Sequence, residues 1–536
     1  MNDKWLSASA VGLLAAMAAV VPGVAPALAE AAERPNIVLV LTDDEDFKTH
    51  SFLPSVKSLL ADKGAVFDNY FTTYSFCCPS RATALRGQYA HNHRIVGNDV
   101  PSGGFDKFRE LGHEASTVAT WLQDAGYHTA ILGKYLNHYE PETDAPAPGW
   151  DEWYVPGSEN YAYFNYWLNE NGTPVHYGSE PGDYLTDVIA RRTLSIIERQ
   201  AAGDRPFFLY VAPYAPHSPA TPAPRHAGLF ADQPYPRTPA FDEADVGDKP
   251  SAVRDLPRLA EWELEAIDRH GRERAQSIQS VDEMVRQIVE ALERTGELDN
   301  TYIVYASDNG FHQGEHRMFF GKTTAYEEDI RVPMILRGPG VPEGVRIKPF
   351  VLNNDLAPTF AAMAGVTPPS FVDGRNFLPA VEDQTRPWRQ AFMTERRQGE
   401  RHELTGTAKF DALRTAEWTY VEYGNGEREL YDLIRDPYQV QNQIQNADPA
   451  MVAGLSQRLA ELSNCAGSGC REFEDRPMLP AHVPVAEAKP AAKPTTVPSL
   501  AEMPRLPLST KAITQAVEKA ADRSPAQAVV PAVANP

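Results

Sequence analysis

The segment CCPSR at residues 77–81 combines a nucleophile with an anion-binding group. Cys77 offers a thiol, Arg81 offers a guanidinium four residues later, and Pro79 suits the first position of a helix, with Cys78 as its cap or turn residue. The pattern predicts Cys77 at a helix N-terminus, where free backbone N–H groups and the helix dipole attract anions. This arrangement indicates chemistry on an anionic ester. A buried thiol in a turn is the alternative, because free cysteine often packs as a small hydrophobic residue.

Two pairs of oxygen-bearing side chains follow apolar segments of the chain. Asp43-Asp44 follows NIVLVLT, and Asp308-Asn309 follows TYIVYAS. Each apolar segment has the pattern of a buried parallel strand, which delivers side chains at its C-terminal end. The four side chains offer only oxygen atoms, which favours Ca²⁺, with Mg²⁺ as the alternative, over zinc. A solvated turn after a strand is the alternative for either pair alone.

Cationic and imidazole side chains occupy similar positions just past predicted strands or strand-like segments. They are Arg81, Lys134, His217, His312 and Lys322. Open α/β sheets bind their ligands at this edge. A metal, an arginine and lysines around a tetrahedral oxyanion are expected for phosphoryl or sulfuryl transfer.

Apolar strands alternate with helical segments from residue 35 onward, which predicts an α/β fold with a mainly parallel sheet. Residues 272–300 have the apolar spacing of one long helix, which Gly296 should end. After residue 385 the pattern changes. The segments WTYVEY (418–423) and ELYDL (429–433) predict short strands of a smaller antiparallel unit.

Composition excludes some classes of protein. The 536-residue chain has a formal net charge of −22, which argues against a nucleic-acid-binding protein. Four cysteines are too few for a disulfide scaffold, although Cys465 and Cys470 flank a flexible spacer that permits a bridge.

The N-terminus predicts export. We predict a signal peptide over residues 1–29, with a membrane anchor as the alternative. The signs of a signal peptide are Lys4, the apolar run after it and the small-residue cleavage site Ala27-Leu28-Ala29. No later segment reaches transmembrane length, so we expect a secreted or periplasmic protein without stable membrane insertion.

Several motifs together resemble the type I sulfatase family. Cys77-x-Pro79-Ser80-Arg81 followed by Leu85-x-Gly87 resembles the first sulfatase signature. The second sulfatase signature is resembled by GYHTAILGKY. The later metal and lysine segment of the family is resembled by SDNG with GKTTAYEEDIRVP, and its C-terminal module by ELYDLIRDPYQVQN. The resemblance covers about residues 35–475 and is nearest to the N-acetylglucosamine-6-sulfatase and extracellular heparan sulfatase branch.

The resemblance implies an alkaline-phosphatase-like sandwich with a mainly parallel central sheet and a smaller C-terminal α+β subdomain. It implies that a separate enzyme oxidises Cys77 to formylglycine (3-oxoalanine), whose hydrate attacks a sulfate ester. The implied cation ligands are Asp43, Asp44, residue 77, Asp308 and Asn309. Arg81 would hold the geminal diol, and Lys134, Lys322 and His217 would bind sulfate or protonate the leaving alcohol. The expected substrate is a sulfated aminosugar or an aryl sulfate.

One position departs from the family pattern. Many members have a histidine two residues after the signature lysine, as the base of the second step, and this chain has Leu136 there. His312 is our preferred replacement, with His93 as the other candidate. Two other functions stay open at this point: a phosphonate or phosphate monoester hydrolase of the same superfamily, and a catalytically inactive glycan-binding relative.

The predicted organisation has four parts. They are a signal peptide at 1–29, a catalytic domain at 30–385, a C-terminal subdomain at 386–475 and a disordered Pro- and Ala-rich tail at 476–536.

Overall fold

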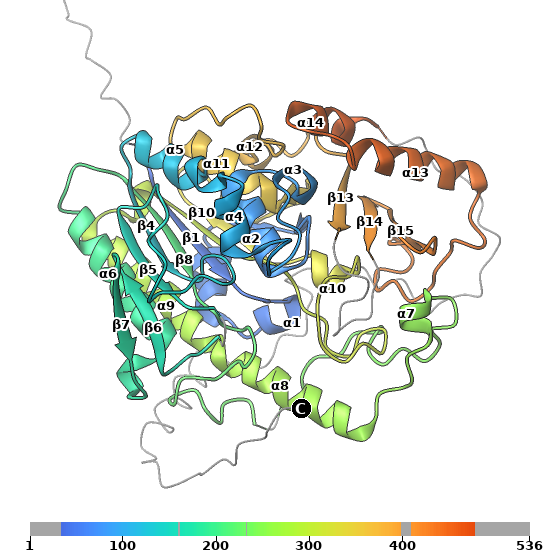
Figure 1. The fold of residues 1–536 in the computed structure, drawn as a ribbon, viewed down its shortest axis with the longest axis horizontal. Coiled ribbons are helices and arrows are strands. Elements are labelled where there is room, and N and C mark those ends of the chain that lie inside the picture. The colour runs from blue at the N-terminus through green and yellow to red at the C-terminus, as the bar shows by residue number, and fades with distance from the viewer. Residues whose placement is uncertain (1–33, 159–160, 232, 398–408, 478–536) are drawn as a thin grey trace, which may run out of the picture. The chain divides into compact units, whose positions relative to one another are not determined.

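The computed structural model describes residues 34–158, 161–231, 233–397 and 409–477. A ten-stranded sheet runs through its centre (Figure 1). In sheet order the strands are β11 (Val345–Ile347), β2 (Ala65–Phe67), β10 (Met334–Arg337), β9 (Thr301–Ser307), β1 (Asn36–Thr42), β8 (Phe207–Ala212), β4 (His128–Gly133), β5 (Glu152–Pro156), β6 (Tyr166–Glu170) and β7 (Thr173–Tyr177).

The middle of this sheet is parallel. Strands β9, β1, β8, β4 and β5 pair in parallel, and Val38 of β1 lies between Ile303 of β9 and Leu209 of β8. Antiparallel pairs appear toward both edges, where β10 joins β9 and where β6 joins β5 and β7. The predicted fold class, an α/β sandwich with a mainly parallel central sheet, is confirmed.

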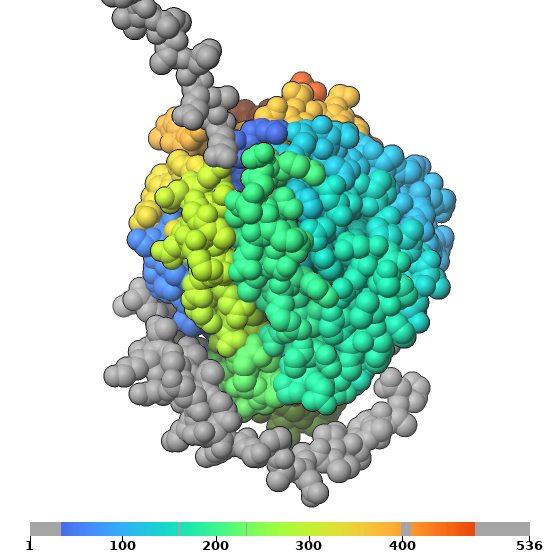
Figure 2. Space-filling model, turned by 90° about the vertical axis from the view of Figure 1, so that its left-hand side faces the viewer, coloured from blue at the N-terminus to red at the C-terminus, as the bar shows by residue number. Residues whose placement is uncertain are grey.

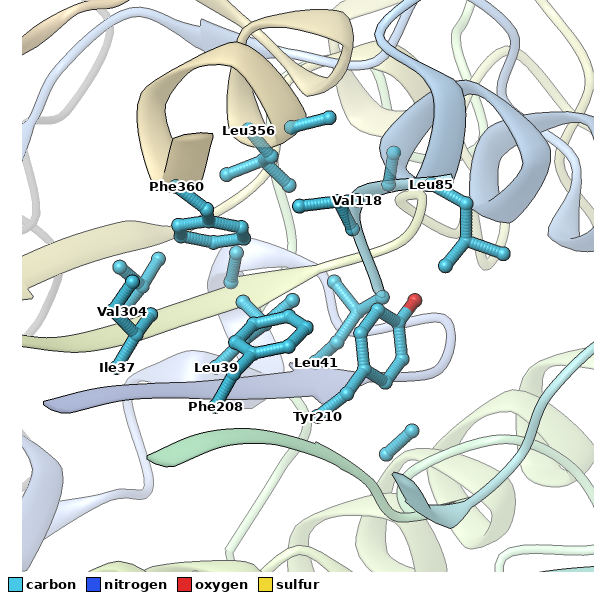
Figure 3. Packing of buried hydrophobic residues seen from close by; sticks show 14 of the residues in the cluster. Ile37, Leu39, Leu41, Leu85, Val118, Phe208, Tyr210, Val304, Leu356 and Phe360 are labelled. Carbon is cyan, nitrogen blue, oxygen red and sulfur yellow. The ribbon is translucent and has the colours of Figure 1, made fainter. Parts of the chain in front are cut away.

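Helices cover both faces of the sheet, because successive side chains of a strand point to opposite sides. Ile37, Leu39 and Leu41 of β1 pack with Leu356 and other residues beneath α2 (Cys77–Arg86), α5 (Val118–Asp124) and α11 (Leu356–Met363), as Figure 3 shows. Val38 and Val40 face the opposite layer, formed by α6 (Leu185–Gln200) and α9 (Gln279–Thr295). These two helices lie side by side in Figure 2.

The prediction of one continuous helix over residues 272–300 is wrong. The chain forms α8 (Glu261–Ser277) and α9, which are separated at Ile278. Gly296 does end α9, in the left-handed conformation that glycine adopts without steric cost.

Shorter helices connect the main elements. They are α1 (Phe47–His50), α3 (Ala90–His93), α4 (Gly104–Glu110), α7 (Ser251–Arg254), α10 (Glu327–Ile330) and α12 (Leu378–Glu382). A π-helical turn, η1 (Val56–Ala61), precedes β2. Within the described residues, no helix is long and apolar enough to cross a bilayer.

A separate four-stranded antiparallel sheet follows the catalytic region. Its strands are β13 (Ala391–Arg396), β14 (Phe410–Thr415), β15 (Trp418–Tyr423) and β16 (Arg428–Asp432). Helices α13 (Pro449–Leu462) and α14 (Ser468–Asp475) share a hydrophobic core with this sheet. The predicted hairpin is confirmed as β15 and β16, and the Cys465–Cys470 disulfide is present. The boundary between residues 385 and 386 stays a prediction.

The predicted signal peptide lies outside the described residues, as does the predicted tail beyond residue 477.

Candidate active site

The carboxyl ends of β1 and β9 bring the predicted oxygen ligands together. The two strands end in register, because Thr42 is paired with Ser307. Each strand is followed directly by its pair of ligands. The backbone N–H of Asp44 donates to Asp308 Oδ1 over 3.2 Å, which joins the two pairs. Asp44 has a φ of 66°, a conformation that non-glycine residues rarely adopt and that often marks functional sites.

Asp43 is surrounded by positive groups. Its carboxylate accepts a hydrogen bond from Lys134 Nζ over 2.5 Å, and Arg81 Nη2 lies 3.8 Å away. Burial alone would raise the pKa of Asp43, but Lys134, His217 and Arg81 together hold that pKa well below its usual range. Asp43 is therefore ionised at every physiological pH and is available as an anionic ligand.

Gly133 explains how Lys134 reaches this carboxylate. Gly133 ends β4 with a φ of 99°, and a Cβ built at this position would lie 2.1 Å from the Ala212 carbonyl oxygen of β8. Only glycine permits this close approach of the two strands. The next residue, Lys134, is then buried and points at Asp43.

Cys77 lies at the start of α2, but the helix differs from the prediction at its first turn. Phe76 is the N-cap, so the helix begins two residues before Pro79. Cys77 Sγ accepts a hydrogen bond from Lys322 Nζ over 2.8 Å. Burial raises the pKa of the thiol to about 11. The unmodified thiol is therefore protonated at neutral pH and is a poor nucleophile.

Arg81 is fully buried one turn further along α2. Its Nε donates to Asp308 Oδ2 over 2.8 Å, and its Nη1 donates to the Lys134 carbonyl oxygen over 3.0 Å. Its Nη2 is buried and, within the described part of the chain, has no hydrogen-bond partner. A buried guanidinium nitrogen with spare N–H capacity can bind an oxyanion in this position.

The contacts of Asn309 show whether the side chains of this site suit a cation. Its Nδ2 donates to Asp44 Oδ1 over 2.6 Å, and Lys322 Nζ also hydrogen-bonds this oxygen. Asn309 Oδ1 is buried and has no hydrogen-bond partner among the residues that the structure describes. A buried amide oxygen beside carboxylates is a ligand that Ca²⁺ or Mg²⁺ takes. The residues therefore fit a hard divalent cation.

The ligand atoms also converge in space. Asp43, Asp44, Cys77 and His217 each offer one ligand atom, and these atoms lie within 4.8 Å of one another. Asp308, on the other side of Arg81, has a pKa raised to about 6 by burial and by the nearby Asp43 carboxylate. A cation at this position would relieve the repulsion between these carboxylates.

His217 faces the acidic pair from the loop after β8. Its Nδ1 donates to the Ser218 carbonyl oxygen over 2.6 Å, which leaves Nε2 directed at Asp44 Oδ2, 3.6 Å away. Burial lowers the pKa of His217 to about 4. The ring is therefore neutral near pH 7, with an unprotonated Nε2 that can accept a proton.

Tyr161 is a site residue that the sequence reasoning missed. Its ring stacks on the His217 ring with centroids 3.8 Å apart and planes 17° apart. Lys134 Nζ lies 4.6 Å from the Tyr161 ring centroid, and Asn137 Nδ2 donates to the Tyr161 hydroxyl over 2.8 Å. The aromatic segment YAYFNYW was the sequence signal, but nothing in it indicates a contact with His217.

Arg274 was also missed. It lies within α8, where its position looked like that of any other charged residue of an amphipathic helix. Its Nη2 donates to the Asp44 carbonyl oxygen over 2.6 Å and to Asp46 Oδ2 over 2.7 Å. Its Nη1 donates to the Pro216 carbonyl oxygen over 3.3 Å. Arg274 thereby ties the Asp44 turn to the loop that carries His217.

The two candidate second-step bases lie elsewhere. His312 Nδ1 is 3.0 Å from Asp329 Oδ1, and its buried Nε2 has no partner among the described residues. His312 is not one of the four residues grouped around Cys77. Both ring nitrogens of His93 are engaged, by Thr83 Oγ1 and by the Ile95 N–H. His312 therefore stays a prediction, while the bonding of His93 leaves no ring nitrogen for a substrate proton.

Comparison with known proteins identifies the family. Residues 35–366 match the sulfatase family model. The chain belongs to the sulfatase family. Residues 314–465 of this sulfatase also match the model named N-sulphoglucosamine sulphohydrolase, C-terminal. The predicted family, and with it the predicted enzyme class of sulfuric ester hydrolase, is confirmed at the family level.

This sulfatase is similar to several named sulfatases. The chain is 33% identical to an N-acetylglucosamine-6-sulfatase of Capra hircus, with 83% of this chain and 86% of the relative covered. It is 36% identical to a putative extracellular sulfatase Sulf-1 homolog of Caenorhabditis elegans over 67% of this chain, and the match spans about half (52%) of that relative. A solved structure in complex with its substrate D-glucosamine-2-N,6-O-disulfate matches with a TM-score of 0.67 and 26% identity, covering 80% of this chain and 97% of that one.

Proposed function

We propose that this protein is an exported sulfatase that hydrolyses a sulfate ester of an aminosugar. Its proposed nucleophile is formylglycine derived from Cys77, and its proposed cofactor is a divalent cation, Ca²⁺ in preference to Mg²⁺. One observation carries the proposal. Cys77 Sγ lies in a buried group with the Asp43 and Asp44 carboxylates and His217, and it accepts a hydrogen bond from Lys322. A nucleophile between anionic metal ligands and an ammonium group suits attack on a bound oxyanion.

The proposed cation ligands are Asp43, Asp44, residue 77, Asp308 and Asn309. The cation would polarise the sulfate oxygens. A formylglycine hydrate at residue 77 would supply one hydroxyl that attacks sulfur and displaces the alcohol, and a second hydroxyl whose deprotonation would expel sulfate and restore the aldehyde. The net reaction consumes one water and yields an alcohol and sulfate. The unpartnered Asn309 Oδ1 and the ionised Asp43 support this ligand set.

The remaining residues bind and orient the ester. Arg81 Nη2 has a free N–H to donate to the geminal diol or to a sulfate oxygen. Lys134 and Lys322 hold their ammonium groups against Asp43 and Asp44, and Lys322 also contacts residue 77. His217 Nε2 is placed to exchange a proton with the leaving oxygen. His312 is proposed as the second-step base.

The substrate class and location are supported by the relatives. Two of the proteins described above carry 6-sulfated glucosamine in their names. Relatives of Caenorhabditis elegans and Drosophila melanogaster are named extracellular sulfatases, which supports export through the predicted signal peptide at residues 1–29. A formylglycine-generating or equivalent enzyme is the proposed partner, because the chain supplies only the Cys77 precursor.

Turnover of paired substrates tests the proposal. The purified protein should hydrolyse N-acetylglucosamine-6-sulfate and 4-nitrophenyl sulfate with a higher kcat/KM than 4-nitrophenyl phosphate. Cys77→Ala should abolish sulfate release, while Cys78→Ala, its neighbour without an assigned role, should retain it. A much higher kcat/KM on the phosphate ester would instead assign the protein to the phosphonate and phosphate monoester hydrolases.

A further inference from the structure

Three aromatic side chains form a contiguous partly exposed surface, here called the aromatic ledge: Trp262, Phe319 and Phe320. Trp262, at the start of α8, has 63% of its surface exposed. Its ring contacts Phe319 edge-on with centroids 5.5 Å apart, and the Phe319 and Phe320 centroids are 4.0 Å apart. Single exposed aromatic residues are ordinary on protein surfaces, but three joined through Phe319 form a patch that suggests a ligand.

The ledge is continuous with the candidate active site on two sides. Phe320 precedes Lys322 by two residues, and Lys322 Nζ lies 2.8 Å from Cys77 Sγ. The Phe320 ring also contacts the His270 ring at 5.0 Å, and His270 Nε2 lies 3.0 Å from Ser218 Oγ, next to His217. A ligand held at residue 77 that extends toward α8 would therefore meet these rings.

The chemistry of the ledge suits the C–H face of a sugar ring. Among the described residues, no lysine or arginine cation lies over the three rings, whereas Arg274 does lie 4.7 Å from the ring centroid of the neighbouring Phe311. Within the described residues, the three rings thus offer apolar surface on which no lysine or arginine is stacked. The partly polar tips of Trp262 and His270 can meet sugar hydroxyls at its margins.

We propose that the aromatic ledge binds an uncharged sugar ring adjoining the sulfated residue, so that the protein acts on sulfated oligosaccharides in preference to sulfated monosaccharides. This inference rests on the proposed sulfatase function and extends it to a second sugar subsite. The occupant is a pyranose of the same glycan chain, stacked through its C–H face.

Kinetics on matched substrates test the inference with the full-length, modified enzyme. The substrates are N-acetylglucosamine-6-sulfate and an oligosaccharide that carries the same sulfated residue next to an unsulfated sugar. Trp262→Ala and Phe319→Ala should each raise KM for the oligosaccharide about 3- to 10-fold, the range expected for one lost aromatic contact, with kcat unchanged. Both variants should keep the wild-type kcat/KM on the monosaccharide, and Trp262→Phe should recover most of the oligosaccharide affinity.

Trp167→Ala is the matched control, because Trp167 is a partly exposed tryptophan (39%) on β6, outside the ledge. It should leave both substrates unaffected. An unchanged oligosaccharide KM in Trp262→Ala, or an equal rise for the monosaccharide, would contradict the second subsite. Sedimentation measures the oligomeric state of both proteins. If the wild type is an oligomer and Trp262→Ala is a monomer, the ledge is a contact between copies of the chain, which would also contradict the second subsite. Failure of the wild-type enzyme on every sulfate ester would refute the proposed function instead.

Discussion

At the scale of single residues, the site is a balanced set of buried charges. Each of its three carboxylates has a different nearest cationic side chain, and Asp43 also lies 3.8 Å from Arg81. The pairs are Asp43 with Lys134, Asp44 with Lys322, and Asp308 with Arg81. A divalent cation adds two positive charges, which a sulfate monoester and one ionised oxygen on residue 77 would offset. This balance explains why a chain with a net charge of −22 can bind an anion at this one place.

Tyr161 gives a prediction at this scale. Tyr161→Ala removes the ring that stacks on His217 and should lower kcat about 10-fold, because the imidazole loses its fixed orientation. Tyr161→Phe keeps the stack, loses only the bond from Asn137, and should stay closer to wild type. Steady-state kinetics on 4-nitrophenyl sulfate measure both. Tyr177→Ala, which removes a stacked ring on β7, is the control. Equal kcat values for Tyr161→Ala and wild type would exclude an orienting role.

At the scale of elements, the sequence predicted the strand ends better than the contacts between loops. The apolar runs before Asp43 and Asp308 identified β1 and β9, because a buried parallel strand requires such a run. The β6–β7 hairpin was missed although its turn, Asn171-Gly172, is a standard hairpin signal. The Tyr161–His217 stack joins residues far apart in the chain, and no local pattern encodes such a contact.

The short helix α10 gives a pH prediction. Burial and the nearby Glu315 raise the pKa of Glu328 to about 8, and no described residue forms a hydrogen bond with Glu328 Oε2. A raised folded-state pKa means that the folded state holds this proton when the unfolded state has released it. Protonated Glu328 therefore makes its full contribution to the free energy of unfolding below pH 4.5. That contribution is lost as pH rises toward 8, by at most about 1.4 kcal/mol per pH unit.

Glu328→Gln removes this titration, so its free energy of unfolding should fall less than that of wild type between pH 5 and pH 8. Urea unfolding at a series of pH values measures the difference. Glu290→Gln on the exposed face of α9 should follow the wild-type curve. Parallel curves for Glu328→Gln and wild type would show that Glu328 ionises normally in the folded protein.

At the scale of the whole molecule, buried ion pairs join the C-terminal sheet to the catalytic region. Arg389 donates to Asp355, at the start of α11, and to Glu474 of α14, and all three are fully or almost fully buried. Glu395 of β13 binds His91 of α3. The sequence indicated a change of architecture after residue 385, but it could not indicate these pairs, because they depend on the tertiary fold.

Cation binding should stabilise the whole fold. A ligand that binds only the folded state at 100 times its Kd adds about 2.7 kcal/mol, so Ca²⁺ should raise the Tm of chelator-treated protein. Asn309→Ala removes the unpartnered oxygen and should reduce this rise, while Asn464→Ala on the exposed end of α13 should not. Calorimetry measures the Tm values. An identical Ca²⁺-dependent rise in Asn309→Ala would exclude Asn309 as a ligand.

Mass spectrometry of the peptide that contains residue 77, from active protein made in its native host, tests the central claim most directly. The buried, protonated Cys77 thiol is a poor nucleophile, so the active form should carry an aldehyde there. We predict the mass of 3-oxoalanine at residue 77, an unmodified Cys78 beside it, and activity in proportion to the modified fraction. Full activity in protein whose residue 77 is entirely unmodified cysteine would contradict the account.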